Sequence, residues 1–542
     1  MRSRRDSTDL NVKEYWRPTH LQSSIHIVAE SITHLPPRPI AEFLSIMFFK
    51  YTEVNSFYAE RPWVQEKLDL CYNPNTIFTA SDIPWVCTIF AILAVGTQMA
   101  HMEEDRAGSD FNVPEDIFAC SEDAIGLGFY RIACKLVPDV IIAASYESVQ
   151  AFLILAVFAL PVSTGGLSYT YFGLAMKMAI QNGMHRKYTG DDFNRKTIEL
   201  RNRLFWSVYS LERRTSIMHG RPNSLARCEV NADLPTNSPE FDSPNFGNMI
   251  AFIDLVSWTA EVSETLVQFK RCPKRLLSEY SERLMHLKIK TRQWWESLPI
   301  NHDCRDLTPQ GPLFRHNCHL KLCYLGIYVY MGRPFIFNPR NRYLEEERND
   351  NESQQSELVK DCVQSAFEIL ATLQSLADNF GLCRASYTEF SSCRAALLVI
   401  LAESLNSGMS SALHGGLNRG MVLIRQMTGG TSSQSEISYI ESMEMAIRQL
   451  LSNNESDEHR SNTAQRSTSA YAKFKDWTQS MKRDNCFGNT TELSSFSPVS
   501  CLNSGAGSAF NPDINDWNNL LNSDWTASEL NLDPEAFLDP GT

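Results

Sequence analysis

The residues best suited to holding a metal ion lie within eight positions of one another. They are His316, Cys318, His319 and Cys323, and on a helix His316, His319 and Cys323 share one face. Structural zinc sites use paired ligands such as CxxC from two chain segments, and the chain contains no CxxC. The stretch continues with apolar residues, which favours a buried core helix whose thiols pack as small hydrophobic groups. We therefore expect no metal or other cofactor here.

Sequence motifs for catalysis are also missing. The chain contains no GxSxG, Walker loop, HExxH or GxGxxG. The pair Gly126 and Gly128 lacks the third glycine of a dinucleotide loop, since Arg131 stands in its place. The prediction is a protein that is not an enzyme. An enzyme on a helical scaffold, with catalytic residues distant in sequence, is the alternative with the least support.

A group of arginines on one predicted helix could bind an anion or a nucleic acid. The arginines are Arg201, Arg203, Arg213, Arg214 and, just beyond the helix, Arg221. Glutamates are interleaved with them, and Leu204, Phe205 and Val208 form an apolar stripe. A helix that packs on one face and makes ion pairs on the other explains this pattern better. We interpret these arginines as structural.

The C-terminal segment combines acidic and aromatic residues. After Arg483 there is no Lys or Arg, and residues 511–542 place apolar side chains among seven carboxylates. Such a composition is typical of disordered activation segments, whose apolar residues a coactivator groove binds as a short induced helix. The residues expected to do this are Trp517, Leu520, Leu521, Trp525, Phe537 and Leu538. An inert tail, or one that docks on its own core, is the alternative.

Composition sets the broader class. The 542 residues are 43% hydrophobic and carry a formal charge of −13, which indicates a large core and argues against a free-standing nucleic-acid surface. The first nine residues are polar, and the 14 cysteines show no regular framework, so reduced thiols inside a cell are expected. No stretch reaches the ~20 apolar residues that span a bilayer. The best candidate, Val149–Leu160, is expected to be a core helix.

Helical periodicity recurs along most of the chain, and no period-2 strand pattern is convincing. The predicted helices are 40–51, 85–98, 114–136, 145–160, 169–185, 197–219, 250–269, 276–295, 312–330, 356–379 and 393–407. Gly220 and Pro222 are the expected stop signals of the long helix before them. The fold class is therefore all-α, a multi-helix regulatory domain with a disordered acidic C-terminal tail.

Polar stretches divide this chain. We expect a short, partly disordered segment at 1–34, a helical domain at 35–451, a Ser/Asn/Thr-rich linker at 452–510 and the acidic-aromatic segment at 511–542. Residues 341–356 are rich in Glu, Asn and Gln and are expected to be mobile.

Several segments together resemble a known domain. The block from Glu199 to Pro222 is similar to E-x-R-R-R-L-F-W-S-x-Y-x-L-D-R-R…G-R-P, with Trp206 at its tryptophan and Glu212 in place of the usual Asp. Residues 171–185 resemble Y-x-G-x-A-x-R-M-A-x-x-x-G-L-H, and residues 148–156 resemble S-x-Q-A-L-x-L-L-A. These motifs occur in the order of the fungal-specific transcription factor domain, or middle homology region, of Zn₂Cys₆ zinc-cluster regulators. The resemblance is best over 35–235.

The resemblance implies a helical regulatory domain in a nuclear transcription factor. In that family an N-terminal zinc cluster recognises DNA, placing a helix in the major groove. Here the first cysteine is Cys71, inside the helical region, so zinc and DNA binding are expected only through a cluster upstream or on a partner.

Two functional hypotheses follow. The first is a transcriptional regulator with a signal-sensing core and an activating tail. The second is a cluster-less cofactor that acts through a partner regulator. Coactivators or a partner regulator are the expected partners, and a small-molecule effector would bind between helices.

Overall fold

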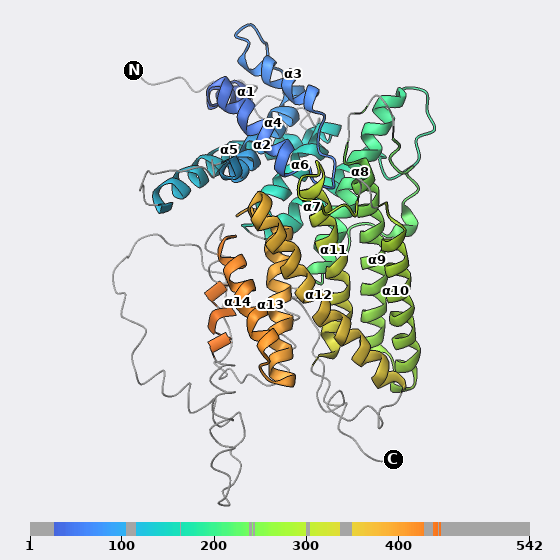
Figure 1. The fold of residues 1–542 in the computed structure, drawn as a ribbon. Helices are drawn as coiled ribbons and strands as arrows, with labels where there is room; N and C mark the ends of the chain where they lie inside the picture. Colours follow the sequence, from blue (N-terminus) through green and yellow to red (C-terminus); the bar gives the residue numbers. More distant parts are fainter. Residues whose placement is uncertain are drawn as a thin grey trace, which may run out of the picture.

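The computed structural model describes residues 26–103, 115–162, 164–237, 241, 244–299, 304–336, 350–427, 437–438, 440–442 and 444–445. Within these ranges all regular structure is helical, which confirms the predicted all-α class (Figure 1). The first eight α-helices are α1 His26–Ile32, α2 Arg38–Tyr51, α3 Arg61–Tyr72, α4 Ile83–Met99, α5 Glu115–Ala143, α6 Tyr146–Ala159, α7 Tyr169–Gln181 and α8 Arg195–Met218. The remaining ones are α9 Phe246–Arg271, α10 Leu277–Ser297, α11 Phe314–Gly332, α12 Asp350–Phe380, α13 Tyr387–Ser407 and α14 Ser411–Arg425.

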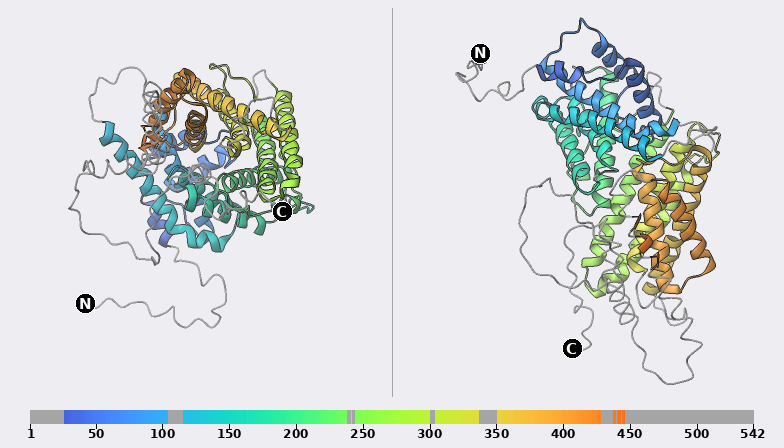
Figure 2. Two further views of the ribbon diagram at one scale, coloured as in Figure 1. Left: turned by 90° about the horizontal axis from the view of Figure 1, so that it is seen from below. Right: turned by 90° about the vertical axis from the view of Figure 1, so that its left-hand side faces the viewer.

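The helices form two lobes, each around its own hydrophobic cluster. We call α1–α8 the N-terminal lobe and α9–α14 the C-terminal lobe. The first cluster draws almost entirely on the N-terminal lobe, and the second is built from the C-terminal lobe. In Figures 1 and 2 the helices of the C-terminal lobe stand side by side as a bundle, and the N-terminal lobe lies across one end of it. Leu211 of α8 packs against both clusters.

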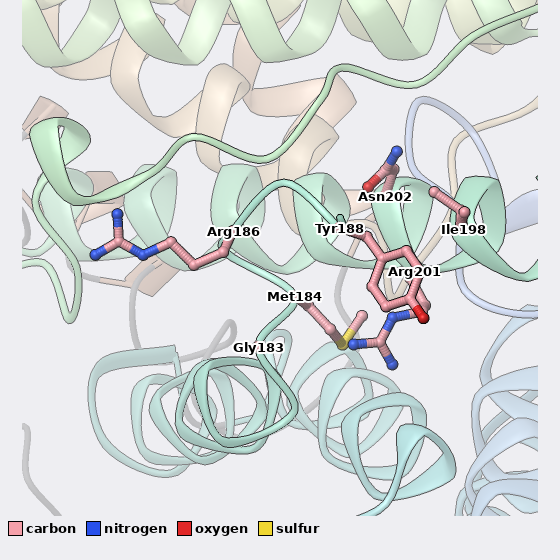
Figure 3. Close-up of a pocket in the computed structure, with 7 residues that line it drawn as sticks. All are labelled: Gly183, Met184, Arg186, Tyr188, Ile198, Arg201 and Asn202. Atoms are coloured by element: carbon pink, nitrogen blue, oxygen red, sulfur yellow. The ribbon is translucent and has the colours of Figure 1, made fainter. Parts of the chain in front are cut away.

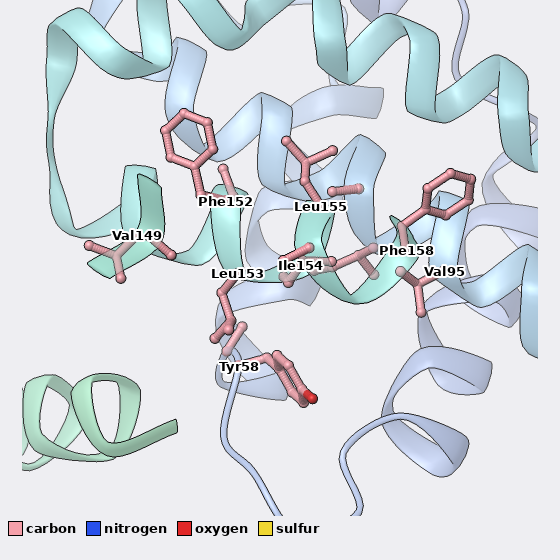
Figure 4. Packing of buried hydrophobic residues seen from close by; sticks show 14 of the residues in the cluster. Tyr58, Val95, Val149, Phe152, Leu153, Ile154, Leu155 and Phe158 are labelled. Carbon is pink, nitrogen blue, oxygen red and sulfur yellow. The ribbon is translucent and has the colours of Figure 1, made fainter. Parts of the chain in front are cut away.

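The centre of the N-terminal lobe is the pair α4 and α6. Val149, Phe152, Leu153, Ile154 and Leu155 of α6 have no accessible surface, and Figure 4 shows them packed among neighbouring helices. A helix that is apolar all round must be covered on every side. This explains why α6 is buried, as the sequence predicted for Val149–Leu160.

One helical stretch among the described residues is long and apolar enough to cross a membrane. It runs from Ala80 to Glu103, and 89% of its most apolar window is buried inside the protein. The sequence analysis missed it by naming Val149–Leu160 as the best candidate. Burial to this degree is what a core helix requires.

Several predicted boundaries were wrong. We expected the helix beginning near 114 to end before Pro138, but α5 continues to Ala143 with Pro138 inside it. Proline in a helix costs one backbone hydrogen bond. Ala133, Leu136 and Val140 have no accessible surface, and their burial offsets that loss. Packing thus overrides the local stop signal.

Three helices were not predicted, and one segment was misjudged. The pattern analysis did not find α1, α3 or α14, and α1 lies in the segment 1–34 that was expected to be partly disordered. Residues 350–356, which were expected to be mobile, form the first turns of α12, while residues 341–349 lie outside the described residues. Polar residues dominate those turns, which lowers their hydrophobic signal without preventing a helix.

Candidate functional site

Arg203, the most buried of the predicted arginines, fastens a loop to α8. Its side chain is 1% exposed and lies 2.7 Å from a carboxylate oxygen of Glu199. It donates a hydrogen bond to the carbonyl of Thr236 at 3.0 Å, and its guanidinium lies over the rings of Phe241 and Phe246. A planar, always charged guanidinium suits this combination of ion pair and ring stacking.

Trp206 and Glu199 hold the same loop. The Trp206 indole N–H donates to the carbonyl of Asp233 at 2.9 Å. Glu199 accepts hydrogen bonds from the backbone N–H and hydroxyl of Thr236. The guanidinium of Arg227 lies over the indole, 5.4 Å from the ring centroid. Two turns of α8 therefore fix the proline-containing loop after it.

The end of α8 follows the predicted stop signal. Gly220 has a φ of +60°, a left-handed conformation that glycine adopts without strain. The N–H of Arg221 bonds to Ser216 O, and the N–H of Gly220 bonds to Ile217 O. This is the Schellman pattern, which satisfies the last carbonyls of a helix. Pro222 follows directly, and its carbonyl accepts a hydrogen bond from the Tyr169 hydroxyl.

Glu212, which stands where the resembled domain usually has Asp, also stabilises the turn at the end of α8. Glu212 accepts hydrogen bonds from the Ser224 N–H at 2.8 Å and from the Ser216 hydroxyl at 3.2 Å. Burial raises the pKa of Glu212, and these hydrogen bonds oppose that rise. Its neighbour Arg213 lies 3.5 Å from Glu264 of α9, so α8 is tied to both lobes.

The other predicted arginines point to different surroundings. Arg201 donates to the carbonyl of Asn182 and lies over the Phe193 ring. Arg221 lies over the Tyr169 ring, 4.8 Å from its centroid. Arg214 alone faces α13, where it donates to the hydroxyl of Thr388 at 3.3 Å. The arginines therefore do not converge on one anion site.

The four potential metal ligands of α11 have separate environments. His319 is hydrogen-bonded to Glu389, and Cys318 is 1% exposed within the second hydrophobic cluster. The pKa of His316 is lowered to about 4 by burial and then by the positive charges of His319 and Arg315. Across the part of the chain that the structure describes, no three His, Cys, Asp or Glu residues are grouped as metal ligands would be.

A polar network, which sequence reasoning missed, joins the lobes. Its centre is Glu389, near the start of α13, whose side chain has no accessible surface. One oxygen of Glu389 bonds to Arg315 and lies 2.7 Å from His319 Nε2, while the other accepts the backbone N–H of Cys383 at 2.9 Å. Burial opposes ionisation, but Arg315 and His319 together keep the pKa of Glu389 below its usual value.

The residues around Glu389 contact the N-terminal lobe. Arg315 lies over the ring of Tyr51, and the N–H of Arg384 donates to His101 Nε2 at 3.3 Å. The pKa of His101 is lowered to about 4, chiefly by burial and then by Arg384. His101 is thus a neutral acceptor. We call Glu389, Arg315, His319 and the His101–Arg384 contact the inter-lobe seam.

A small hollow lies beside the start of α8. Figure 3 shows its lining, which includes Arg186, Tyr188 and Arg201. Its volume is about 20 Å³, roughly the space that one water needs. It is too small for a metabolite.

Four of the buried cysteines are unsuited to nucleophilic catalysis. Burial raises the pKa of Cys71, Cys318, Cys362 and Cys383 to about 12, so these thiols stay protonated.

The predicted activation residues, from Trp517 to Leu538, lie outside the described residues, as does the 452–510 linker. The assignment of those segments stays a prediction.

These features define a class: an all-helical, two-lobed domain whose charged residues tie loops and lobes together. The chain carries a fungal specific transcription factor domain, which matches residues 46–306. The match extends past residue 235, where the best resemblance ended, and includes the N-terminal lobe from the second half of α2 together with α9 and α10.

Its relatives are fungal transcriptional regulatory proteins. The chain is 28% identical over 390 residues to an uncharacterized transcriptional regulatory protein of Schizosaccharomyces pombe, covering 70% of this chain and 46% of the relative. It is 26% identical to the thiamine repressible genes regulatory protein thi1 of the same yeast, over 54% of this chain and 36% of that protein. It is also 26% identical to activator of stress genes 1 of Saccharomyces cerevisiae, over 58% and 33%. The matches span less than half the length of these relatives.

Proposed function

We propose that this protein is a nuclear transcriptional regulator whose helical domain transmits a signal to an activating tail. The observation that carries the proposal is the fungal specific transcription factor domain at residues 46–306, together with relatives named as transcriptional regulators. The two-lobed domain supplies the sensing part. Residues 511–542 supply the contact to coactivators, because their apolar side chains lie among carboxylates.

DNA recognition is assigned to sequence or a partner outside these residues. The chain has a net charge of −13, whereas phosphate contacts require a basic surface. A zinc cluster, on an adjoining segment or on a partner regulator, would supply that surface. The helical domain would then control where and when the tail acts.

A reporter experiment tests the regulatory function. The full chain is fused to an unrelated DNA-binding module, and transcription is measured from a promoter with intermediate basal output. A change of several-fold in either direction is the expected result. Unchanged transcription, with the fusion present in the nucleus at normal level, would contradict the proposal.

The tail is tested separately in the same assay. Residues 484–542 fused to the module should activate, and Trp517→Ala combined with Trp525→Ala should lower the signal sharply, because the groove-binding anchors are lost. The matched control is Asn519→Ala with Asn522→Ala, which alters the same segment without removing an aromatic ring. Equal output from both double variants would mean that charge alone accounts for activation.

A further inference from the structure

The outer sides of α5 and α7 form one continuous surface, which we call the α5–α7 face. The two helices run alongside each other in the same direction. The hydroxyls of Tyr130 and Tyr171 lie 2.9 Å apart, and just past the ends of both helices the side chain of Asn182 donates to the carbonyl of Ala144 at 2.7 Å. α5 lies at the edge of the N-terminal lobe (Figures 1 and 2).

Apolar side chains are exposed on the α5–α7 face. Leu127 and Ile141 of α5 are 38% and 40% exposed, and Leu167, just before α7, is 38% exposed. Pro138 of α5 is exposed, and Leu174 of α7 is half-buried. Pro138 and Ile141 follow Leu127 by close to three and four whole helical turns, so the three share one side of α5. Clustered exposed apolar groups mark an interaction surface.

The exposed charges of this face are positive. They belong to Arg131 and Lys135 of α5 and to Lys177 of α7. The sequence of α7 contains no Asp or Glu, and the one carboxylate of α5 within residues 127–143, Asp139, is 1% exposed. The face thus combines apolar side chains with three accessible cations.

These cations are available to an acidic partner. Among the residues that the structure describes, no ion pair holds Arg131 or Lys177. Lys135 lies 3.9 Å from Glu30 of α1, but both side chains are exposed, so water screens the pair. Asp123, one turn before Leu127, has a side chain outside the described set, and we define the face from Leu127 onward.

The C-terminal segment has the complementary composition. Residues 511–530 contain four carboxylates and no Lys or Arg. Trp517, Leu521 and Trp525 recur every four residues, so in a helix they share one side and span about 12 Å. The stretch of α5 from Leu127 to Ile141 is about 21 Å long, which is enough for such a helix.

The chain supplies this segment at a high local concentration. Residues 446–516 separate Met445, the last described residue, from Trp517. A flexible chain of about 70 residues spans roughly 45 Å on average. A compact domain of about 400 residues has a radius of gyration of about 21 Å, so the segment can reach the face. An attached segment also competes at an effective concentration far above that of a free acidic peptide.

We propose that residues 511–530 bind the α5–α7 face of their own chain as an amphipathic helix. The two tryptophans and Leu521 contact the exposed apolar side chains, and the carboxylates lie beside Arg131 and Lys177. Aromatic anchors supply most of the affinity in such complexes, and the surrounding charges set orientation and rate. The bound segment is covered and cannot reach a coactivator at the same time. This regulatory consequence rests on the proposed function, whereas the binding does not.

The test uses the full chain with Trp517→Ala and Trp525→Ala, whose own segment has lost its anchors. A fluorescein-labelled peptide of residues 511–530 is added, and fluorescence anisotropy gives its affinity. The peptide should bind this variant at micromolar concentration. It should bind the wild type at least tenfold more weakly, because the attached segment occupies the face.

Charge reversal on the face tests where the peptide binds. Arg131→Glu with Lys177→Glu, added to the double alanine variant, should weaken peptide binding at least tenfold. The matched control is Lys290→Glu with Arg419→Glu, which reverses two exposed cations on α10 and α14 of the other lobe. It changes the net charge equally and should leave the affinity unchanged. Thermal unfolding checks that each variant is folded.

Several results would overturn the proposal. They are no binding to the double alanine variant, equal affinity for that variant and the wild type, and equal weakening by the two charge reversals. Equal affinity would mean that the face is open to a separate acidic partner. Light scattering detects a second copy: a wild-type dimer that the two alanines abolish would place the segment on a neighbouring molecule and would also contradict the proposal.

Transcription gives a separate readout. In the full-chain fusion, Arg131→Glu with Lys177→Glu should raise reporter output several-fold, because the segment is released. If the peptide binds as expected while output stays unchanged, the docking stands and the activating role of the segment fails.

Discussion

Glu389 shows how a single buried charge is held in place. Its side chain has no accessible surface, and the two oxygens are engaged by Arg315, His319 and the Cys383 N–H. Each partner removes part of the cost of burying a carboxylate. Removal of the negative charge of Glu389 should therefore destabilise the fold, because Arg315 would stay buried without a counter-ion.

Glu389→Gln keeps the shape and removes the charge. We expect it to lower the free energy of unfolding by about 3–5 kcal/mol, the range for breaking a buried ion pair. Urea denaturation followed by circular dichroism measures this. The control is Glu30→Gln, whose partner Lys135 is 3.9 Å away with both side chains exposed, and it should change stability far less. Equal effects of the two variants would contradict the assigned role of Glu389.

The lowered pKa values of two histidines predict how the stability of the fold depends on pH. The pKa values of His101 and His316 are lowered from 6.5 to about 4, in both cases chiefly by burial. Between those pH values the unfolded chain binds more protons than the folded chain, so stability falls as the pH falls from 7 to 4. Each histidine contributes up to roughly 3 kcal/mol to that loss.

His101→Gln tests one of these contributions. Glutamine can accept the Arg384 N–H but does not titrate, so the variant should lose less stability between pH 7 and pH 5 than the wild type. Urea denaturation at several pH values gives the two slopes. Parallel curves would mean that His101 does not carry this dependence. His34→Gln, at a histidine exposed on the surface, is the matched control.

Sequence reasoning found the α8 residues but not those of the seam. Arg203, Trp206 and Gly220 stand in a local pattern, and their hydrogen-bond partners lie within α8 or in the loop that follows it. Glu389 lies 74 positions from Arg315 in the chain. No spacing rule relates residues so far apart, and the predicted helix began only after Glu389.

At the scale of elements, α11 carries two glycines with opposite surroundings. A Cβ on Gly332 would lie 2.2 Å from the carbonyl oxygen of Leu358 and 2.5 Å from the Cβ of Cys362, so α11 and α12 cross here without room for a side chain. A Cβ on Gly326, on the same helix, would meet nothing within 4 Å.

The two alanine substitutions should therefore differ in sign. Gly326→Ala should stabilise by about 0.5–1 kcal/mol, because alanine favours a helix more than glycine does. Gly332→Ala should destabilise by about 1–3 kcal/mol, because α12 must move away. Thermal unfolding of both proteins decides this. A stabilised Gly332→Ala would show that the crossing is looser than described.

The presence of a helix was easier to predict from the sequence than the residues at which it begins and ends. The long, strongly periodic α8 was predicted within two residues at its start and one at its end. The end of α5 was not, because Pro138 is a local stop signal whereas the burial of Leu136 and Val140 depends on distant helices. Local patterns report local preferences, and packing decides where the two disagree.

At the scale of the molecule, cysteines at the surface and in the core differ in the exposure of their thiols. Cys228 is exposed, whereas Cys87 of the N-terminal lobe and Cys393 of the C-terminal lobe have no accessible surface. Burial also raises the pKa of both buried thiols. Thiol reactivity requires access and a thiolate.

Iodoacetamide labelling should follow that division. In the native protein Cys228 should react within minutes, while Cys87 and Cys393 should react only when urea unfolds the chain. Peptide mass spectrometry identifies the labelled sites. The reduced, unlabelled protein and the Cys228→Ser variant are the controls. Rapid native labelling of Cys393 would mean that the C-terminal lobe opens locally.

The division into two lobes could not be read from the sequence, which suggested one domain over 35–451. Helical periodicity reports that a face is buried but not which other helix buries it. The assignment of each helix to one of the two clusters requires the tertiary structure.

The inter-lobe seam has a consequence for how contact between the lobes depends on temperature. The lobes meet where Arg315 lies over Tyr51 and the Arg384 N–H bonds to His101, and Glu389 and His319 are buried beside Arg315. The cost of removing charges from water falls on warming, while hydrophobic attraction weakens on cooling. We therefore expect contact between the lobes to weaken on cooling.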